Sequence, residues 1–111
     1  MMKPEHKDLA AGRWKTLTFF EQMANIAGEV ERASNWKIKA KPDYSEKAFA
    51  RALELVDLTL DSTTTKTHLR ELTRMREALV DFFAGSNQSG STDASWKKYF
   101  LPFVYAARRN S

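Results

Sequence analysis

Apolar residues recur every three or four positions through four long segments of this chain, and this spacing restricts the fold more than any other feature. An α-helix with one apolar face has this period, whereas a half-buried strand alternates with period two. Almost no stretch of the sequence alternates in that way, so we expect an all-α protein. In the first segment, residues 16–36, the apolar stripe is Phe19, Met23, Ile26, Val30 and Ala33.

The second and third segments repeat this period and carry signals for their ends. Ser45 is expected to cap the second helix, because its hydroxyl can accept a hydrogen bond from an early backbone amide. The third helix is expected to end at Gly85, in the left-handed conformation that glycine adopts without strain. The apolar stripe of the second segment is Phe49, Leu53, Val56 and Leu60.

Asp93 or Ser95 is expected to cap the fourth segment, which is rich in aromatic residues. We assign Phe100 and Phe103 to the core, together with Phe19 of the first segment, because aromatic residues at helical spacing usually pack inside. Pro102 should kink this helix or start it afresh, since proline removes a backbone hydrogen bond. The segment is apolar over most of its circumference, which indicates a second buried face and hence a contact between subunits.

Four amphipathic helices with short connections predict an antiparallel four-helix bundle. We expect residues 1–12, which contain two helix breakers, to be a flexible arm, and residues 13–111 to be the bundle domain. No apolar run approaches the roughly 18 residues of a membrane span, so no membrane contact is expected. The chain has no cysteine, which suits a reducing compartment, and we expect a cytoplasmic protein.

No motif in the sequence supports catalysis. His68-x-x-Glu71 lacks the further ligands that a metal site needs, so we expect His68 to be a solvated residue near a helix start. Ser95-x-x-Lys98 has the spacing of a serine–lysine nucleophile pair but lacks the accompanying motifs. There is no glycine-rich phosphate loop and no HExxH zinc motif. We therefore expect a non-enzymatic protein with no catalytic residue, no metal site and no cofactor.

Positive charge is concentrated in the third and fourth segments and in "WKIKAK", residues 36–41, where three lysines accompany a tryptophan. The chain has 18 Lys and Arg against 14 Asp and Glu, and the whole excess lies after residue 93. Three further cations stand four residues apart on one face of the third helix, and we expect the acid Glu71 to lie off that face. These cations could neutralise phosphates without reading base sequence. The alternative is a solvated face whose cations pair with acids of a neighbouring helix or subunit. The predicted nucleic-acid-binding residues are Lys66, Arg70, Arg74, Lys97, Lys98, Arg108 and Arg109.

The layout of the four segments resembles a known family. The segments are "FFEQMANIAGEVERASNW", "SEKAFARALELVDLTL", "LRELTRMREALVDFFAG" and a basic final helix. This order is similar to that of the four-helix-bundle proteins encoded in ribosomal RNA intervening sequences, and of the accessory variability proteins of diversity-generating retroelements. The resemblance covers about residues 13–110 and rests on layout. It implies a homo-oligomeric, pentameric barrel with a basic surface that binds a reverse transcriptase and its template RNA.

Two functions follow as expectations. The first is a non-enzymatic accessory protein that holds template RNA or cDNA on a basic oligomer surface, as the partner of a retroelement reverse transcriptase. RNA or single-stranded DNA would then be its ligand. The alternative is a protein–protein adaptor with no nucleic-acid role, whose exposed aromatic residues contact a partner protein.

Overall fold

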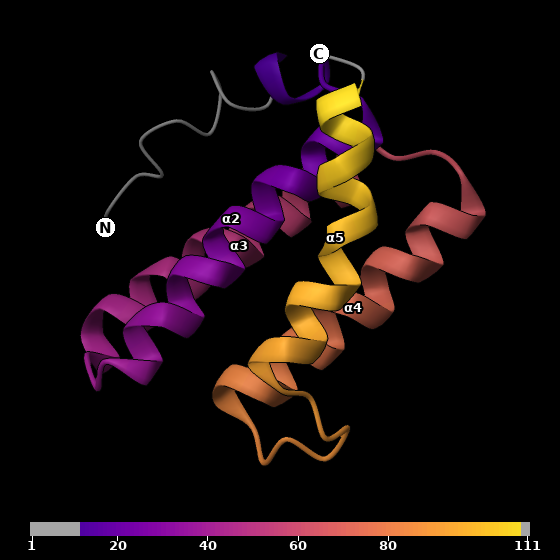
Figure 1. Ribbon diagram of the computed structural model, residues 1–111. Coiled ribbons are helices and arrows are strands. Elements are labelled where there is room, and N and C mark those ends of the chain that lie inside the picture. The colour runs from indigo at the N-terminus through magenta and orange to yellow at the C-terminus, as the bar shows by residue number, and fades with distance from the viewer. Residues whose placement is uncertain (1–11, 110–111) are drawn as a thin grey trace, which may run out of the picture.

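The computed structural model describes residues 12–109, and all regular structure in that range is helical (Figure 1). The all-α prediction is therefore confirmed. The arm predicted at residues 1–12 lies outside the described residues except for Gly12. No helix within residues 12–109 is long and apolar enough to cross a lipid bilayer. A short helical turn at residues 12–14 precedes α2 (Phe19–Ile38), α3 (Pro42–Ser62), α4 (Lys66–Ala84) and α5 (Asp93–Arg109).

Buried polar side chains tie α2 and α3 into a helical hairpin. Near the connection, the Ser45 hydroxyl donates a hydrogen bond to the Ala33 carbonyl oxygen at 2.9 Å. Near the other end, Trp14 Nε1 donates to Thr59 Oγ1 at 2.9 Å, and Gln22 Nε2 donates to the Trp14 carbonyl oxygen at 2.9 Å. Thr59 is fully buried, so its hydroxyl would be costly to leave without a partner. These bonds set the register of the two antiparallel helices.

The prediction that Ser45 caps α3 was wrong. The helix begins three residues earlier, at Pro42, whose fixed φ suits the first helical position. Lys41 occupies the cap position and makes no side-chain hydrogen bond there. Ser45 instead lies one turn inside α3 and is buried against α2.

The buried line of α3 also differs from the predicted stripe. Leu53 is only half-buried and does not belong to the core cluster, so its predicted place at the centre of the stripe was wrong. Small side chains on the buried line let α2 and α3 approach closely, because the distance between helix axes depends on the side chains at the contact. The buried residues of α3 are Ser45, Ala48, Ala52, Val56 and Thr59.

All four helices contribute to the core, and most of its large side chains come from α2, α4 and α5. Phe100 is buried as predicted, while Phe19 and Phe103 are partly buried and pack against the core. The principal core residues are Met23, Ile26 and Val30 of α2, Leu72, Met75, Leu79 and Phe82 of α4, and Trp96 and Phe100 of α5.

The start of α5 differs from expectation, because neither Asp93 nor Ser95 is its cap, and of the two alternatives at Pro102 the fresh start is excluded. The cap is Thr92, whose hydroxyl oxygen accepts from the Ser95 amide at 2.9 Å, while Ser95 Oγ accepts from the Thr92 amide at 2.8 Å. Such a reciprocal pair satisfies two amide groups at a helix start. The helix then continues through Pro102 to Arg109, so no new helix starts at the proline.

Gly85 ends α4, but not in the predicted left-handed conformation. Its φ is −106°, and the left-handed residues of this connection are Asn87 (φ 56°) and Gly90 (φ 68°). Glycine is needed at position 85 because the backbone of Asp81 lies too close to leave room for a side chain. A Cβ there would lie 3.1 Å from both the Cα and the carbonyl oxygen of Asp81.

We therefore expect Gly85→Ala to lower the free energy of unfolding by about 1 kcal/mol, because the backbone must shift to admit the methyl group. Gly28 is the matched control, since it is exposed within α2 and a Cβ there meets nothing within 4 Å. Gly28→Ala should raise the free energy of unfolding by about 0.5–1 kcal/mol through helix propensity. Urea unfolding of both variants measures the difference, and changes of the same sign would contradict the close approach at Gly85.

Candidate nucleic-acid interface

The seven cations predicted to bind nucleic acid are all exposed, but they do not share one surface. Arg70 and Arg74 line a groove between α4 and α5. Lys97 and Arg108 line a different groove, between α2 and α5. The cations that line neither groove are Lys66, Lys98 and Arg109.

The α4–α5 groove combines positive charge, hydroxyl groups and aromatic rings in a volume of about 540 Å³. Arg70 and Arg74 are one helical turn apart, about 6 Å along the axis of α4. Ser95, at the start of α5, is exposed on the facing side, and Trp96 and Tyr99 line the groove beside it. Two guanidinium groups at this spacing can contact successive anionic groups of one ligand.

Glu71 lies in the same groove, between the two arginines in sequence, and binds α5. The Tyr99 hydroxyl donates a hydrogen bond to Glu71 Oε2 at 2.7 Å. Burial, together with this bond and the Glu71 charge, raises the pKa of Tyr99 well above its usual range. The phenol therefore stays neutral and holds α5 against α4, while the Glu71 carboxylate remains as a negative charge that opposes an anionic ligand.

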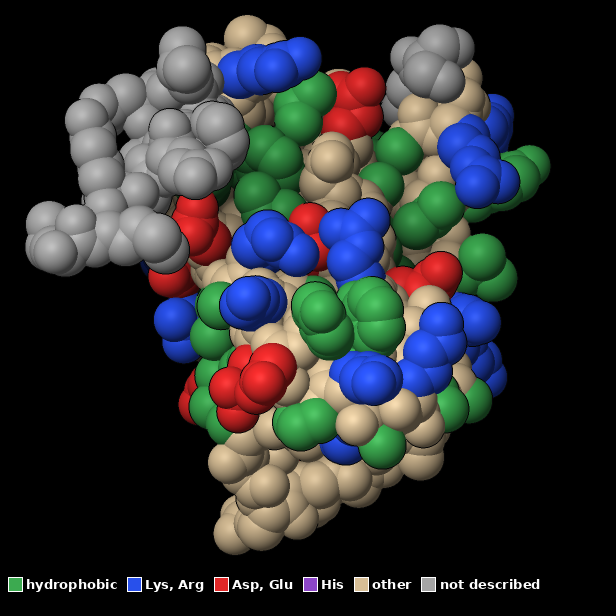
Figure 2. Space-filling view, turned by 90° about the vertical axis from the view of Figure 1, so that its left-hand side faces the viewer, with side chains coloured by type: hydrophobic (Ala, Val, Ile, Leu, Met, Phe, Trp, Pro, Cys, Tyr) green, Lys and Arg blue, Asp and Glu red, His purple; other side chains and the backbone are tan. Residues whose placement is uncertain are grey.

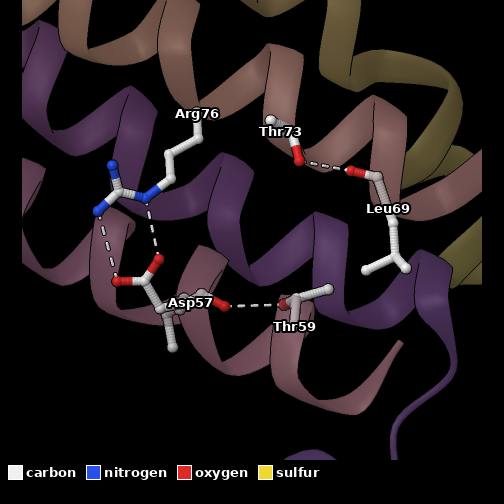
Figure 3. A network of polar contacts seen from close by, with 6 residues as sticks. Asp57, Thr59, Leu69, Thr73 and Arg76 are labelled. Carbon is white, nitrogen blue, oxygen red and sulfur yellow. Dashed lines mark hydrogen bonds and ion pairs between the residues drawn. The ribbon is translucent and has the colours of Figure 1, made fainter. Parts of the chain in front are cut away.

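Arg76 does not line this groove, although it follows Arg74 by only two residues. Its side chain points toward Asp57 instead (Figure 3). Its Nε donates to Asp57 Oδ1 at 2.9 Å, and a second nitrogen reaches Oδ2 at 3.5 Å. The hydrogen bond to Asp57 raises the pKa of Arg76. For this arginine the alternative interpretation holds, because the cation pairs with an acid of the neighbouring helix α3.

His68 is not the solvated residue that the sequence predicts. Its ring stacks on Phe19, with centroids 3.8 Å apart and planes within 3°, and the side chain is half-buried. This contact joins α4 to the start of α2. Among the described residues, no group of three or more His, Asp or Glu side chains is placed to hold a metal ion.

The α2–α5 groove has a different character. Its volume is about 490 Å³, and Val30, Phe100 and Val104 form apolar walls. At its rim, Ile38 and Leu101 are 67% and 63% exposed, respectively. The charged residues that line it are balanced, with two acids and two cations. This groove matches the surplus apolar face that the sequence indicates for α5, and it suits an apolar segment of another chain better than a polyanion.

Sequence reasoning placed Glu71 off the face of the arginines and did not use Tyr99 in the site. Glu71 is three residues before Arg74, and side chains at this spacing are neighbours on a helix. The sequence could therefore have placed Glu71 beside the arginines. The bond to Tyr99 joins residues 28 positions apart, and nothing in the local pattern indicates it. No family model, no curated protein and no solved structure matches this chain.

Proposed function

We propose that this protein binds RNA or single-stranded DNA through the α4–α5 groove, as a non-enzymatic accessory protein. The pair of exposed arginines one turn apart, Arg70 and Arg74, carries the proposal. Guanidinium groups bind phosphate in a two-pronged geometry that ammonium groups cannot provide. Lys66 continues the row by one more turn of α4, so three cations can follow a phosphate backbone.

The groove offers mainly contacts to phosphate, which position a nucleic acid without reading its sequence. Affinity should therefore depend strongly on salt and little on base sequence. Electrophoretic retardation of RNA and single-stranded DNA at 50 and 200 mM salt tests this. We expect retardation of several unrelated sequences at 50 mM and a steep loss at 200 mM. A protein that retards neither ligand at 50 mM salt would overturn the proposal.

The finer architecture that we propose is an antiparallel four-helix bundle that assembles as a homo-oligomer. Contacts between the helix pairs support the first part. The ring centroids of Phe49, early in α3, and Phe83, late in α4, lie 5.0 Å apart. Those of Phe82 and of Trp96, at the start of α5, lie 6.5 Å apart. The pentamer, the reverse transcriptase partner and the cytoplasmic location are implied by the resemblance or the composition, and they stay predictions.

A second candidate function, a protein–protein adaptor, is favoured by the α2–α5 groove. Its apolar walls and exposed rim residues, Ile38 and Leu101, could seat an apolar helix of another protein. The adaptor function predicts negligible retardation of RNA at physiological salt and also at 50 mM, where the nucleic-acid-binding function predicts clear retardation. The retardation experiment therefore separates the two functions directly.

A further inference from the structure

The connection between α2 and α3, residues 39–41, brings two aromatic rings together at the surface. Trp36, in the last turn of α2, stacks on Tyr44, in the first turn of α3, with centroids 4.7 Å apart and planes 28° apart. Tyr44 is 52% exposed even though Trp36 lies against its ring. The outer face of the Tyr44 ring is therefore open to another flat group.

The backbone of this connection is fixed by hydrogen bonds. The Lys41 amide donates to the Trp36 carbonyl oxygen at 2.9 Å, and the Ala40 amide donates to that of Lys37 at 3.1 Å. Ala40 is left-handed, with φ 58°. This is the Schellman arrangement that closes many helix ends, and it holds the two rings in place before any ligand arrives. A preformed surface binds with a smaller loss of conformational entropy.

Lysines surround the aromatic pair. Lys39 Nζ lies 5.4 Å from the centre of the Trp36 ring, and Lys41 and Lys47 are exposed on either side of Tyr44 in sequence. Lys37 is not part of this group, because its Nζ lies 4.2 Å over the Phe82 ring. Figure 2 views the molecule from the side on which Figure 1 places this connection, and it shows Lys and Arg side chains interleaved with hydrophobic ones.

An open aromatic face flanked by cations is the arrangement with which proteins hold unpaired bases, since every base has a flat face and a phosphate beside it. Bases in a duplex are already stacked and cannot use it. An anionic membrane is the competing ligand, because Ile38 adds exposed apolar surface here. Asp43 and Glu46 lie in the first turns of α3. Their negative charges should repel a densely anionic membrane surface more strongly than a single nucleic-acid strand that contacts only the Tyr44 ring.

We propose that the α2–α3 connection is a second contact site for single-stranded nucleic acid, in which an unpaired base stacks on Tyr44 while Lys39 and Lys41 contact its phosphates. The proposal rests on the proposed function for its ligand class, but it uses different residues. It also adds specificity, because a stacking site requires unpaired bases whereas the arginine pair requires only phosphates.

The test compares oligo(dT) with an abasic oligonucleotide of the same length, which keeps the phosphates and lacks the bases. Tyr44→Ala should weaken oligo(dT) binding by about 5- to 100-fold and leave abasic binding unchanged, because stacking on one base contributes about 1–3 kcal/mol. Tyr44→Phe keeps the ring and should bind oligo(dT) like the wild type. Tyr105→Ala removes another exposed tyrosine, on α5, and is the matched control.

The outcomes separate this site from the α4–α5 groove. If Arg70→Gln with Arg74→Gln weakens both ligands while Tyr44→Ala changes neither, the groove stands and the stacking site is refuted. If the wild type binds neither ligand, both proposals fail. Phosphatidylserine vesicles are the third ligand, and vesicle binding that Tyr44→Ala abolishes, with oligo(dT) binding unaffected, would assign the site to membranes. Thermal unfolding of Tyr44→Ala confirms that the variant is folded before any of these comparisons.

Discussion

Leu79→Ala should lower the free energy of unfolding by about 2–5 kcal/mol. Leu79 is fully buried in α4 and belongs to the core cluster that joins all four helices. Shortening it removes apolar burial and leaves a cavity that its neighbours fill only in part, and both effects favour the unfolded chain. Urea or thermal unfolding monitored by circular dichroism measures the loss. For a domain of this size, each kcal/mol lowers the melting temperature by about 4–8 °C.

Leu53→Ala is the matched control, because it makes the same chemical change on a neighbouring helix. Leu53 is half-buried and lies outside the core cluster, so we expect a loss of only about 1 kcal/mol. If the two variants lost equal amounts of stability, Leu53 would have to belong to the core, contrary to the buried line of α3.

The contrast between Leu53 and Leu79 shows what hydrophobic spacing can predict. The period of three and four residues identified each helix, and in α2 it also identified the buried face, because most of the large apolar residues occupy that face. In α3 the buried face carries Ala48, Ala52 and Thr59, while the leucines lie beside it. When two helices approach closely over small residues, a prediction based on the largest apolar residues places the buried face too far to one side.

The residues used to predict helix ends misled the prediction where another residue nearby could fill the same role. Ser45 has a good capping side chain, but Pro42 starts the helix one turn earlier and Ser45 is then used against α2. Gly85 does end α4, but the left-handed residues come later in the loop. The sequence could not show which residue starts α3 or which residue of the loop is left-handed, because each outcome depends on contacts with residues outside the segment.

The candidate site was predictable in part. The helical spacing of Arg70 and Arg74 placed them correctly on one exposed face. The groove that gives this face its shape depends on how α5 packs against α4, and the Tyr99–Glu71 hydrogen bond belongs to that packing. The division of the other cations between two grooves likewise follows from tertiary structure, since Lys97 and Lys98 are adjacent in sequence yet only Lys97 lines a groove.

Replacing Arg70 and Arg74 together by glutamine should weaken the binding of RNA and single-stranded DNA at 50 mM salt by about 100-fold or more. A hydrogen bond to a charged group contributes about 1.5–3 kcal/mol, and two such groups are removed. The plot of log affinity against log salt should also become shallower by about one to two units, because each lost phosphate contact removes about 0.7–0.9. Fluorescence anisotropy across a range of salt concentrations gives both quantities. Stability should hardly change, because both side chains are exposed.

Glu71→Gln provides a control of opposite sign within the same groove. The amide oxygen can still accept the hydrogen bond from Tyr99, so the packing of α5 is kept, while the negative charge beside the arginines is removed. Affinity for nucleic acid should therefore rise, and most at low salt, where charges are least screened. Arg76→Gln is the control for a cation outside the groove, since Arg76 is paired with Asp57 and its loss should leave affinity unchanged. If the double arginine variant binds as tightly as the wild type, or if Glu71→Gln weakens binding, the α4–α5 groove is not where phosphates bind.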